Sequence, residues 1–524
     1  MTTAARHAVA PRRTVPFETA VPARLDRLPW TRFHTLLVTA LGVTWVLDGL
    51  EATVVAAITP VLEHTGTLGL SPAQIGVAAT LYIAGLVVGS LLFGWLTDRL
   101  GRKRLFTVTL SIYLVGAVLT ALAWDFGSFA AFRFVTGLAI GGEYSAINSA
   151  IDELVPARVR GRVDLAVNGT FWLGAILGSG ATMLLLRHLD EALAWRVAFG
   201  LGALVGGAMI LARRHVPESP RWLLVHGRVD EAEAVMASIE RHVAAPLPPA
   251  STTMCIDPRV RIGFGAIVRA LLGRYRRRAV LGFVLISSQA LFYNGLSFTF
   301  PLVLAHEFGV PATETGAYIL WMAVANLLGP LVLGGLFDSV GRRTMITGSY
   351  ALAGVVVIGA EILFLRGHVP GLPGAGIGAD LRHAATTLLA HGQLTPDSQT
   401  FLWGVAFFFA SAAASAGYLT VSEIFPVEMR GLAIALFFAL GTTVAAGAPA
   451  VFGYLVESGR PALLALGYGS AGGVMLLAAA VEWWLGVDAE RRSLEEVTTP
   501  LTALRALPPA GAAPSPEALA SPPV

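Results

Sequence analysis

The sequence predicts an all-α membrane protein in which twelve transmembrane helices form two six-helix halves. Three observations support this fold class. Hydrophobic residues make up 55% of the 524 residues and charged residues only 14%, whereas about 25% of a soluble protein is charged. Twelve mainly apolar segments each approach the roughly 20 residues that a spanning helix needs. Two different motifs also occur twice, in the same order, which indicates a duplicated membrane unit.

The apolar segments divide the chain into five parts. A tail, 1–32, precedes the first bundle, 33–212. An arginine-rich polar segment, 213–278, leads to the second bundle, 279–486, and a second tail covers 487–524. The expected spans are 33–59, 73–96, 104–124, 128–152, 163–186 and 195–212 in the first bundle, and 279–304, 313–337, 343–365, 399–422, 431–456 and 462–486 in the second.

The segments outside the bundles are polar and rich in turn-forming residues. We interpret the first tail as mobile and the Pro/Ala-rich stretch from about Pro508 as disordered. Within the central segment, stretches such as 230–240 have the pattern of short surface helices.

Positive charge is unevenly distributed over the tails and loops. If both termini are cytoplasmic, 31 of the 37 lysines and arginines fall on the cytoplasmic side. This distribution follows the positive-inside rule. The preference for arginine and alanine suggests a bacterial source, so we expect a multi-pass protein of the bacterial inner membrane with both termini in the cytoplasm. The longest outer loop, about 366–398, has no predicted role.

The first repeated motif is G-x-x-x-D-x-x-G-R, at 94–102 and 334–342. Its first glycine allows two helices to approach closely. Its aspartate can meet the N-terminus of a neighbouring helix or an arginine, its second glycine makes a tight turn, and its arginine can meet a lipid phosphate or a facing carboxylate. The residues expected to act in a cytoplasmic gating network are Asp98, Arg102, Asp338 and Arg342.

The second repeated motif is E-x-x-P-x-x-x-R-G, at 153–161 and 423–431. Its charged residues are expected to join the same network, and they are Glu153, Arg160, Glu423 and Arg430. A charge network that holds one conformation and breaks in the other can gate alternating access. One motif alone could be a positive-inside anchor, but two motifs duplicated in matching order favour a transporter.

The repeated motifs resemble those of the major facilitator superfamily over about 33–496. After the sixth span, residues 217–223 read P-E-S-P-R-W-L, which is similar to a signature of sugar porters and their relatives, including organic-ion transporters; Glu218 and Arg221 therefore join the expected network. Residues 488–496 resemble P-E-T-K-G-x-S-L-E-E without its proline and first glutamate, a departure from the sugar porters. The resemblance implies the major facilitator fold, active as a monomer in the lipid bilayer.

Two acids, Asp48 and Glu51, lie inside the first span. Three residues apart, they share one helical face, and two carboxylates at membrane depth are costly unless they are protonated or paired. The D-G-x-[DE] pattern is similar to the first span of aromatic-acid:proton and related metabolite:proton symporters. The resemblance also implies that Arg133, at the start of the fourth span, faces Glu51. We predict proton coupling here; purely structural pairing with arginine is the alternative.

The fourth span carries a further acid, Glu143, after two glycines. It could be a second protonation site or part of a helix-packing G-G-E stretch, and the sequence leaves both interpretations open. The position equivalent to Arg133 in the second half is Trp403. We therefore expect the proton site in the first half only.

Substrate contacts are expected from aromatic and amide side chains near the interface between the halves. The candidates are Tyr144, Asn148, Asn168, Trp172, Gln289, Tyr293, Asn294, Trp321, Asn326, Trp403 and Tyr418, together with the acid Glu361. For each of these side chains, simple helix packing is an equally open interpretation.

The predicted function is proton-coupled symport of a small organic metabolite, with an organic acid as the expected substrate. A sugar or polyol porter is the first alternative, although the tenth span lacks the G-P-x-P-W stretch of those proteins. A proton-driven drug efflux antiporter is the second, although no proline stands among the glycines of the fifth span. A transporter-like sensor is the alternative from another class.

Several chemistries are not expected from this sequence. The single lysine, Lys103, lies in R-K-R, so the G-K-[ST] loop of an ATP-driven pump is missing. The single cysteine, Cys255, and the scattered histidines give no metal-ligand spacing. We expect no enzyme activity, no cofactor and no metal. The expected partners are the substrate, protons and the lipid bilayer, and no nucleic acid.

Overall fold

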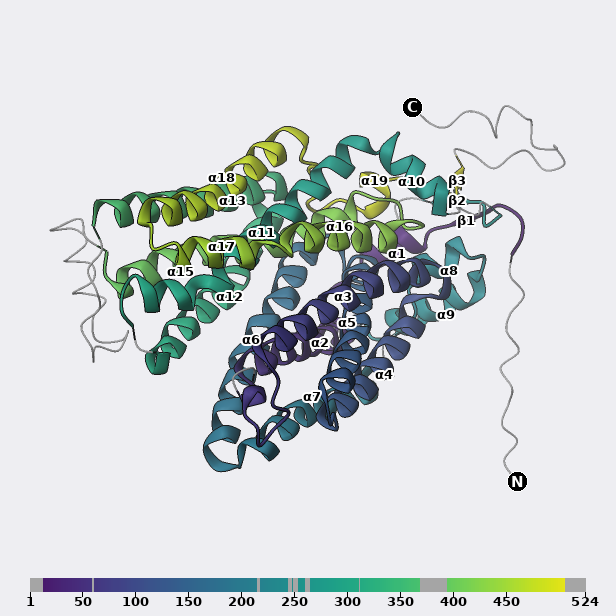
Figure 1. Ribbon diagram of the computed structural model, residues 1–524. Coiled ribbons are helices and arrows are strands. Elements are labelled where there is room, and N and C mark those ends of the chain that lie inside the picture. Colours follow the sequence, from purple (N-terminus) through teal and green to yellow (C-terminus); the bar gives the residue numbers. More distant parts are fainter. Residues whose placement is uncertain are drawn as a thin grey trace, which may run out of the picture.

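Two helical bundles make up most of the molecule (Figure 1). The computed structural model describes residues 13–58, 61–213, 217–243, 247, 253–259, 264–310, 312–367 and 394–504. The two bundles approach each other at the right of Figure 1 and diverge towards the left. The expected 366–398 loop and the stretch from Pro508 lie mostly or wholly outside the described residues.

The first bundle contains six long helices, which match the six predicted spans. They are α2 (Arg32–Ile58), α3 (Pro72–Leu100), α4 (Arg102–Ala121), α5 (Phe126–Leu154), α6 (Arg160–His188) and α7 (Glu191–Arg213). Short 3-10 turns, Val61–Glu63 and Ala157–Val159, connect α2 to α3 and α5 to α6.

The second bundle matches its six predicted spans in position, but one of them is divided. Its helices are α11 (Arg276–His306), α12 (Ala312–Ser339), α13 (Arg342–Arg366), α15 (Pro396–Glu423), α16 (Arg430–Ala445), α17 (Ala448–Glu457) and α18 (Pro461–Leu485). The prediction of one helix over 431–456 was wrong, because α16 ends and α17 begins around Gly447. A glycine followed by the proline at the start of α17 interrupts the helical hydrogen bonds there.

Small residues allow the helices of the first bundle to pack closely. A methyl group at Gly49 of α2 would overlap the backbone of Phe171 in α6, and one at Gly174 of α6 would overlap the backbone of Val46. Only glycine lets the two backbones approach so closely. This contact places the face of α2 that carries the acids at a fixed depth in the bundle.

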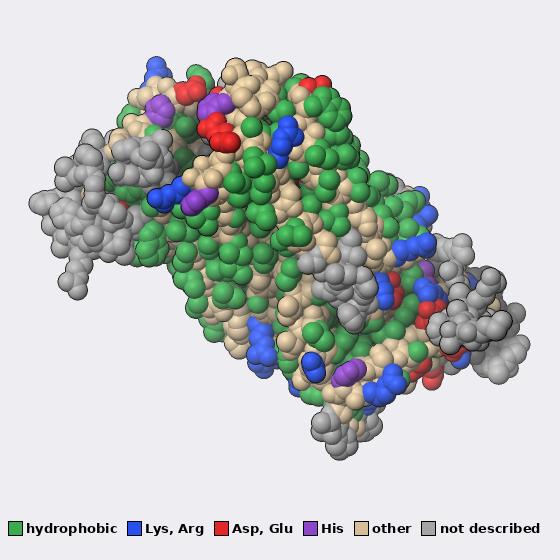
Figure 2. All heavy atoms as spheres, turned by 90° about the horizontal axis from the view of Figure 1, so that it is seen from below, with side chains coloured by type: hydrophobic (Ala, Val, Ile, Leu, Met, Phe, Trp, Pro, Cys, Tyr) green, Lys and Arg blue, Asp and Glu red, His purple; other side chains and the backbone are tan. Residues whose placement is uncertain are grey.

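The outer surface of the bundles is apolar. Within the described residues, nine helices are long and apolar enough to cross a membrane, and α16 adds a shorter apolar helix. Figure 2 shows hydrophobic side chains over the middle of one face, with charged side chains towards its two ends. An apolar band of this kind suits a lipid environment, and the chain is accordingly a multi-pass membrane protein.

The end of the bundles at the right of Figure 1 is named here the charged end. It consists of the connections between consecutive helices at 97–104, 153–162, 338–343 and 423–432. The turn glycines of the first motif lie here with positive φ, Gly101 at 95° and Gly341 at 113°. Both repeats therefore turn at the same end of the molecule, as the motif predicts.

A small three-stranded sheet lies at the charged end and joins three distant parts of the chain. Strand β1 (Phe17–Thr19) pairs antiparallel with β2 (Met254–Ile256), which pairs antiparallel with β3 (Ala503–Leu504). The prediction of a mobile first tail was wrong for this part of the tail. The reason is hydrophobic burial, because Val21 and Leu28 are fully buried.

Short helices complete the folded region beside the sheet. They are α1 (Val21–Asp26), α8 (Pro220–Val225), α9 (Val229–Glu240), α10 (Phe264–Leu272) and α19 (Leu494–Val497). Arg24 of α1 bonds Glu240 of α9, with Nη2 2.6 Å from Oε2, and the arginine lowers the pKa of that carboxyl below its ordinary value. The predicted helix over 230–240 is thus present, and it holds the first tail.

The register of the sheet can be tested with the native cysteine. Glu18 of β1 lies directly opposite Cys255 of β2, and Cα atoms opposed in antiparallel strands are close enough for a disulfide. We expect Glu18→Cys to crosslink to Cys255 on mild oxidation, seen as a reversible mobility change on a non-reducing gel after cleavage between the two positions. Thr19→Cys, which opposes Met254 and points to the other face of the sheet, is the matched control. Equal crosslinking of both variants would contradict the register.

Candidate functional site

The structure brings Arg133 of α5 to Glu51 of α2 inside the first bundle. Arg133 Nη1 donates to Glu51 Oε1, and the two side chains are 3% and 1% exposed. The guanidinium carbon lies 4.2 Å from the centre of the Tyr82 ring and 5.7 Å from that of Phe199. Tyr113 of α4 donates to the other carboxylate oxygen, Glu51 Oε2, over 3.2 Å. Removing one partner of such a buried pair costs about 3–5 kcal/mol, so the pair holds α2 against α5.

The second acid of the first span lies one turn away and points to the other bundle. Asp48 Oδ2 accepts a hydrogen bond from the Tyr144 hydroxyl over 2.7 Å. The Tyr144 ring stacks on Phe438 of α16, with 4.4 Å between ring centres, and lies 6.2 Å from the ring of Tyr418 on α15. Trp45 contacts Tyr144 edge-on. One hydroxyl group therefore links Asp48 to the interface between the bundles.

A small cavity lies beside Asp48 and Glu143. Its volume is about 20 Å³. The lining residues are Thr44, Trp45, Leu47, Asp48, Tyr113, Ile140, Glu143, Tyr144 and Ile147. In the G-G-E stretch, Gly142 packs against α3, since a methyl group there would lie 2.6 Å from Phe93 Cδ2. The glycine thus serves helix packing, while Glu143 faces the cavity, 3.5 Å from the Thr109 hydroxyl.

Aromatic and amide side chains meet between the bundles at a second place. Trp172 of α6 lies 5.9 Å from Tyr293 of α11, measured between ring centres. The Tyr293 hydroxyl donates to Asn326 Oδ1 of α12 over 2.7 Å, and the Asn326 carbonyl accepts the Ser411 hydroxyl of α15 over 2.7 Å. These candidates thus form a connected polar and aromatic surface at the interface.

Three other candidates are buried amides. Asn168 Nδ2 donates to Asn148 Oδ1 over 3.4 Å and to Asp164 Oδ2 over 3.0 Å. The hydrogen bond between Asn148 and Asn168 thus joins α5 to α6. Gln289 of α11 is 5% exposed.

The structure places Trp321 away from the interface. It is 45% exposed and shares one face of α12 with Leu328 and Val332, which are 44% and 61% exposed. Asn326 lies on the opposite, buried side of the same helix. Sequence spacing could not separate these two faces, because α12 is apolar all round.

Trp403 also lies outside the contact surface. Trp403 is fully buried inside the second bundle, 5.1 Å from the ring of Phe300 and 5.0 Å from that of Tyr468. Glu361 of α13 is 4% exposed in the same bundle. Asn294 Nδ2 donates to a carbonyl of its own helix. Trp403 thus packs α11, α15 and α18 together.

Each aspartate of the first repeated motif caps a helix of the opposite bundle. Asp98 of α3 accepts hydrogen bonds from Gly431 N over 3.2 Å and Leu432 N over 3.0 Å, at the start of α16. Asp338 of α12 accepts two hydrogen bonds, from Gly161 N and from the backbone amide of the following residue, both over 2.9 Å, at the start of α6. A carboxylate is stabilised at a helix N-terminus by the helix dipole. The two caps therefore hold the bundles together at the charged end, related by the internal repeat.

The glutamates of the second repeated motif form matching ion pairs. Glu153 forms an ion pair with Arg102 of its own bundle over 2.7 Å and another with Arg430 of the other bundle over 3.3 Å. All three side chains are at most 2% exposed. Opposite charges attract each other strongly where they are buried, because little water screens them. The ion pair between Glu153 and Arg430 therefore stabilises the contact between the bundles in addition to the caps.

The second copy repeats this arrangement. Glu423 forms an ion pair with Arg160 of the first bundle over 3.1 Å and another with Arg342 of its own bundle. Eight of the ten residues of the predicted network thus form two matching buried sets, each of which bridges the bundles, and together they are named here the charged cluster.

The P-E-S-P-R-W-L segment joins this cluster from the central part of the chain. Glu218 Oε1 accepts Arg102 N, at the start of α4, over 2.9 Å. Burial raises the pKa of the Glu218 carboxyl above its ordinary value, while Arg102 opposes this shift. Arg221 donates to the Glu153 carbonyl over 2.8 Å. The segment thus ties α8 to both motifs of the first bundle.

Sequence reasoning missed several acids of the network. Asp26 of α1 pairs with Arg221 over 3.0 Å and with Arg160 over 3.4 Å, and Glu495 of α19 pairs with Arg221 over 2.8 Å. Glu495 lies in residues 488–496, the segment that resembles P-E-T-K-G-x-S-L-E-E, and this resemblance could have predicted its part in the network. No sequence motif contains Asp26. It joins the network because the first tail folds against the charged end, where Asp26 meets Arg160 and Arg221.

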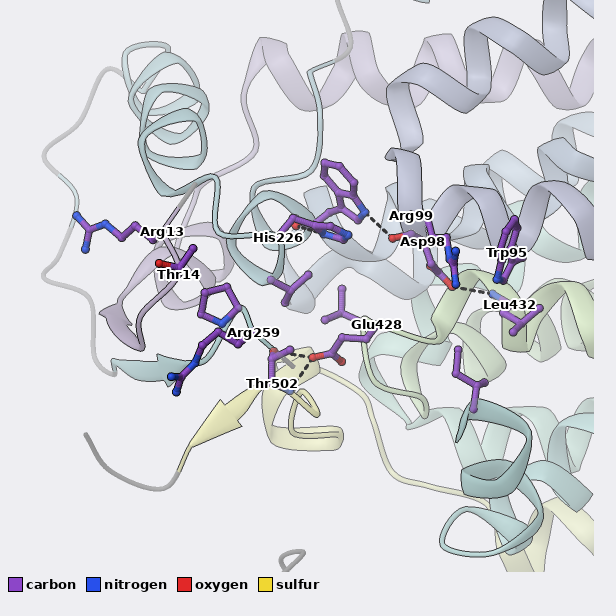
Figure 3. Close-up of a pocket in the computed structure, with 15 residues that line it drawn as sticks. Arg13, Thr14, Trp95, Asp98, Arg99, His226, Arg259, Glu428, Leu432 and Thr502 are labelled. Carbon is purple, nitrogen blue, oxygen red and sulfur yellow. Dashed lines mark hydrogen bonds between the residues drawn. The ribbon is translucent and has the colours of Figure 1, made fainter. Parts of the chain in front are cut away.

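A larger pocket lies at the charged end, between the bundles and the folded tails (Figure 3). Its volume is about 610 Å³. Asp98, Arg99, Trp222, Glu428 and Thr502 are among its lining residues. The Trp222 indole donates to the Asp98 carbonyl, and Glu428 Oε1 accepts the Thr502 amide. Walls from both bundles and from the second tail thus meet around one hollow.

Comparison with known proteins identifies the class to which this fold and site belong. A family model described as sugar (and other) transporter matches residues 50–500. The chain belongs to this family and is therefore a membrane transporter and not an enzyme. Its fold is that of the major facilitator superfamily. A solved structure of the proton:xylose symporter XylE, bound to 6-bromo-6-deoxy-D-glucose, has the same fold. Its TM-score is 0.69 at 18% identity, covering 89% of this chain and 98% of that chain.

Individual relatives have been named for particular substrates. The niacin transporter NiaP of Acinetobacter baylyi is 26% identical over 326 residues, which is 62% of this chain and 72% of that protein. The cis,cis-muconate transport protein of the same organism is 24% identical over 394 residues, 74% of this chain and 80% of that protein. The probable 4-methylmuconolactone transporter of Cupriavidus pinatubonensis is 31% identical over 160 residues, 30% of this chain and 37% of that protein.

The reciprocal caps predict equal effects of two distant substitutions. Asp98→Asn and Asp338→Asn each remove the charge that two amides of the opposite bundle share. We expect each change to weaken closure of the charged end by about 1.5 kcal/mol, because hydrogen bonds to a charged group are worth roughly that much. Opening should then become about tenfold more frequent, measured as faster hydrogen exchange of the first amides of α16 and α6.

Asp125→Asn is the matched control for these two variants. Asp125 caps α5 within its own bundle through Ser128 N, over 2.8 Å. Faster exchange at α16 or α6 in this control, or unchanged exchange in both test variants, would show that the caps do not close the charged end.

Proposed function

We propose that this chain is a proton-coupled symporter that imports a small organic acid by alternating access. The observation that carries the proposal is the connection of the acids to the interface. Glu51 is paired with Arg133 inside the first bundle, and Asp48, one turn away, reaches Phe438 of the other bundle through Tyr144. A change of protonation at these acids therefore alters the contacts at the interface where the two bundles move against each other.

The chemistry of the buried pair supports coupling. Protonation of Glu51 removes its charge and leaves the Arg133 guanidinium without its counter-charge, which costs several kcal/mol in a buried place. A carboxylate substrate that binds between the bundles can offset part of this cost at a distance, because charges are weakly screened from each other inside a protein. Proton and anion then bind in support of each other, as symport requires.

The relatives and the contact surface favour an organic acid. Niacin and cis,cis-muconate, for which two relatives are named, are flat, conjugated carboxylic acids. Aromatic rings from both bundles, those of Tyr144, Trp172, Tyr293 and Phe438, line the interface and suit a flat molecule. The Tyr293–Asn326 hydrogen bond adds polar atoms that fix its orientation.

We propose that the charged end faces the cytoplasm of a bacterial cell and that the protein acts as a monomer in the inner membrane. The distribution of 31 of 37 lysines and arginines supports this orientation. In that orientation, the caps and ion pairs close the cytoplasmic side. The membrane potential then contributes about 2.3 kcal/mol for each charge moved inward per 100 mV.

A sugar porter is the second candidate. A probable plastidic glucose transporter of Arabidopsis thaliana is 25% identical over 372 residues, 70% of this chain and 68% of that protein. Uptake into proteoliposomes with an imposed pH gradient separates the candidates, with niacin, cis,cis-muconate, benzoate, xylose and glucose as substrates. Accumulation of an acid that collapses with a protonophore is the expected result. Uptake of sugars alone, or uptake independent of the pH gradient, would overturn the proposal.

Substitution of the two acids tests the assignment of the proton site. We expect Glu51→Gln and Asp48→Asn to abolish accumulation driven by the pH gradient, because neither variant can exchange the proton. Substrate counterflow without a gradient should remain, since it requires movement of the bundles but no net proton transfer. Both rates are measured in the same proteoliposomes.

Glu361→Gln is the matched control, since Glu361 is an equally buried acid in the second bundle. We expect it to accumulate substrate like the unmodified protein. Loss of accumulation in this variant alone would move the proton site to the second bundle.

A further inference from the structure

Tyr113 lies between the two acids of the first span. Its hydroxyl donates to Glu51 Oε2 over 3.2 Å. The same side chain lines the cavity of about 20 Å³ that Asp48 and Glu143 also line. Asp48 itself is bound by Tyr144, on the side of the interface. Tyr113 is therefore the residue that contacts Glu51 directly and also shares a cavity with Asp48.

The cavity has the size and lining of a site for one water molecule. A single water needs at least about 10–15 Å³ of accessible volume and two to four polar partners. Five of its lining residues, Thr44, Asp48, Tyr113, Glu143 and Tyr144, have side chains that carry oxygen atoms. The remaining walls are apolar, so a water molecule there would be held by these groups.

The position of the Tyr113 hydroxyl is restricted from behind. The residue is 1% exposed. A methyl group at Gly202 of α7 would lie 2.8 Å from the Tyr113 hydroxyl oxygen and 3.4 Å from Glu51 Oε2. Because α7 leaves no room on that side, the hydroxyl keeps its contact with Glu51.

Two of the helices packed around the hydroxyl, α2 and α5, present charged groups to it, and α3 presents a tyrosine. The titratable and charged groups are Asp48 and Glu51 on α2, Tyr82 on α3, and Arg133, Glu143 and Tyr144 on α5. Helix α7 presents Phe199 and Gly202, which carry no charge. The group thus has three acids and one arginine, and Tyr113 touches the acid that the arginine holds.

We propose that Tyr113 relays protons between Asp48 and Glu51 through one water molecule in this cavity. The inference rests on the proposed proton coupling. The Asp48 carboxyl gives its proton to the water, the water gives another proton to the Tyr113 oxygen, and the Tyr113 O–H passes its own proton to Glu51 Oε2. One O–H bond breaks at Asp48 and one forms at Glu51, while the tyrosine and the water are regenerated.

The relay gives the two acids different tasks. Asp48 lies next to the interface through Tyr144 and Phe438, so it exchanges protons when the bundles separate. Glu51 is held by Arg133 inside the bundle, where the arrival of a proton weakens the pair. A fixed hydroxyl between them carries the proton without exposing Arg133 to water.

Tyr113→Phe tests the relay, because it removes the hydroxyl and keeps the ring. We expect uptake driven by a pH gradient to slow by roughly tenfold or more, since a positioned proton-transfer group contributes at least this much. Counterflow at fixed pH should stay within about twofold of the unmodified protein. Initial rates of both processes, with niacin or the acid that the uptake panel identifies, are measured between pH 5 and 8.

Tyr350→Phe is the matched control. Tyr350 is fully buried in α13, and its hydroxyl donates to a backbone carbonyl, that of Leu285, over 3.0 Å. We expect it to change neither rate. If Tyr113→Phe fails to fold, Gly202→Ala replaces it, because the added methyl group displaces the hydroxyl while all titratable side chains remain.

The outcomes separate the relay from the proposed function. If the unmodified protein shows no uptake driven by a pH gradient, the proposed proton coupling fails. If that uptake exists and depends on Glu51, but Tyr113→Phe leaves it unchanged, the relay is overturned. Equal slowing of uptake and counterflow by Tyr113→Phe would also overturn it, because the hydroxyl would then serve packing alone.

Discussion

The charged end of this transporter is closed by carboxylates that cap helices of the opposite bundle. Asp98 and Asp338 each accept two backbone amides across the interface. Because a cap needs both the carboxylate and a correctly placed helix end, it is lost entirely when the bundles separate. Glu153 and Glu423 then lose the cross-bundle arginines as well. Closure of the charged end is therefore a cooperative event, and every contact between the two bundles there depends on it.

The two bundles share a frame but divide the chemistry. The caps and ion pairs repeat in both copies, whereas the Glu51–Arg133 pair has no charged counterpart at Trp403, which packs between aromatic rings instead. The rings of Trp403 and Phe300 carry no titratable group, while a buried ion pair responds to a single proton. The first bundle can thus act as the responsive half and the second as the body against which it moves.

The sequence contained enough information for the frame and for part of the site. Twelve apolar segments and two duplicated motifs predicted the spans, the turns at Gly101 and Gly341, and the charged cluster, because these features depend on local pattern. The interior face of α12 could not be predicted, since Trp321 and Asn326 stand in a helix that is apolar all round. Asp26 and Tyr113 were missed because their roles depend on contacts between segments far apart in the chain.

The small sheet at the charged end has a consequence for how the protein is made. Its strands come from residues 17–19, 254–256 and 503–504, so strand β3 is synthesised only after both bundles. Both bundles can insert and pack before that moment, but the sheet that joins the first tail to the last one cannot be complete. Contacts between such distant segments also form slowly. Completion of the sheet thus waits until β3 has been synthesised, and a copy truncated before β3 would lack this link between the first tail and the second.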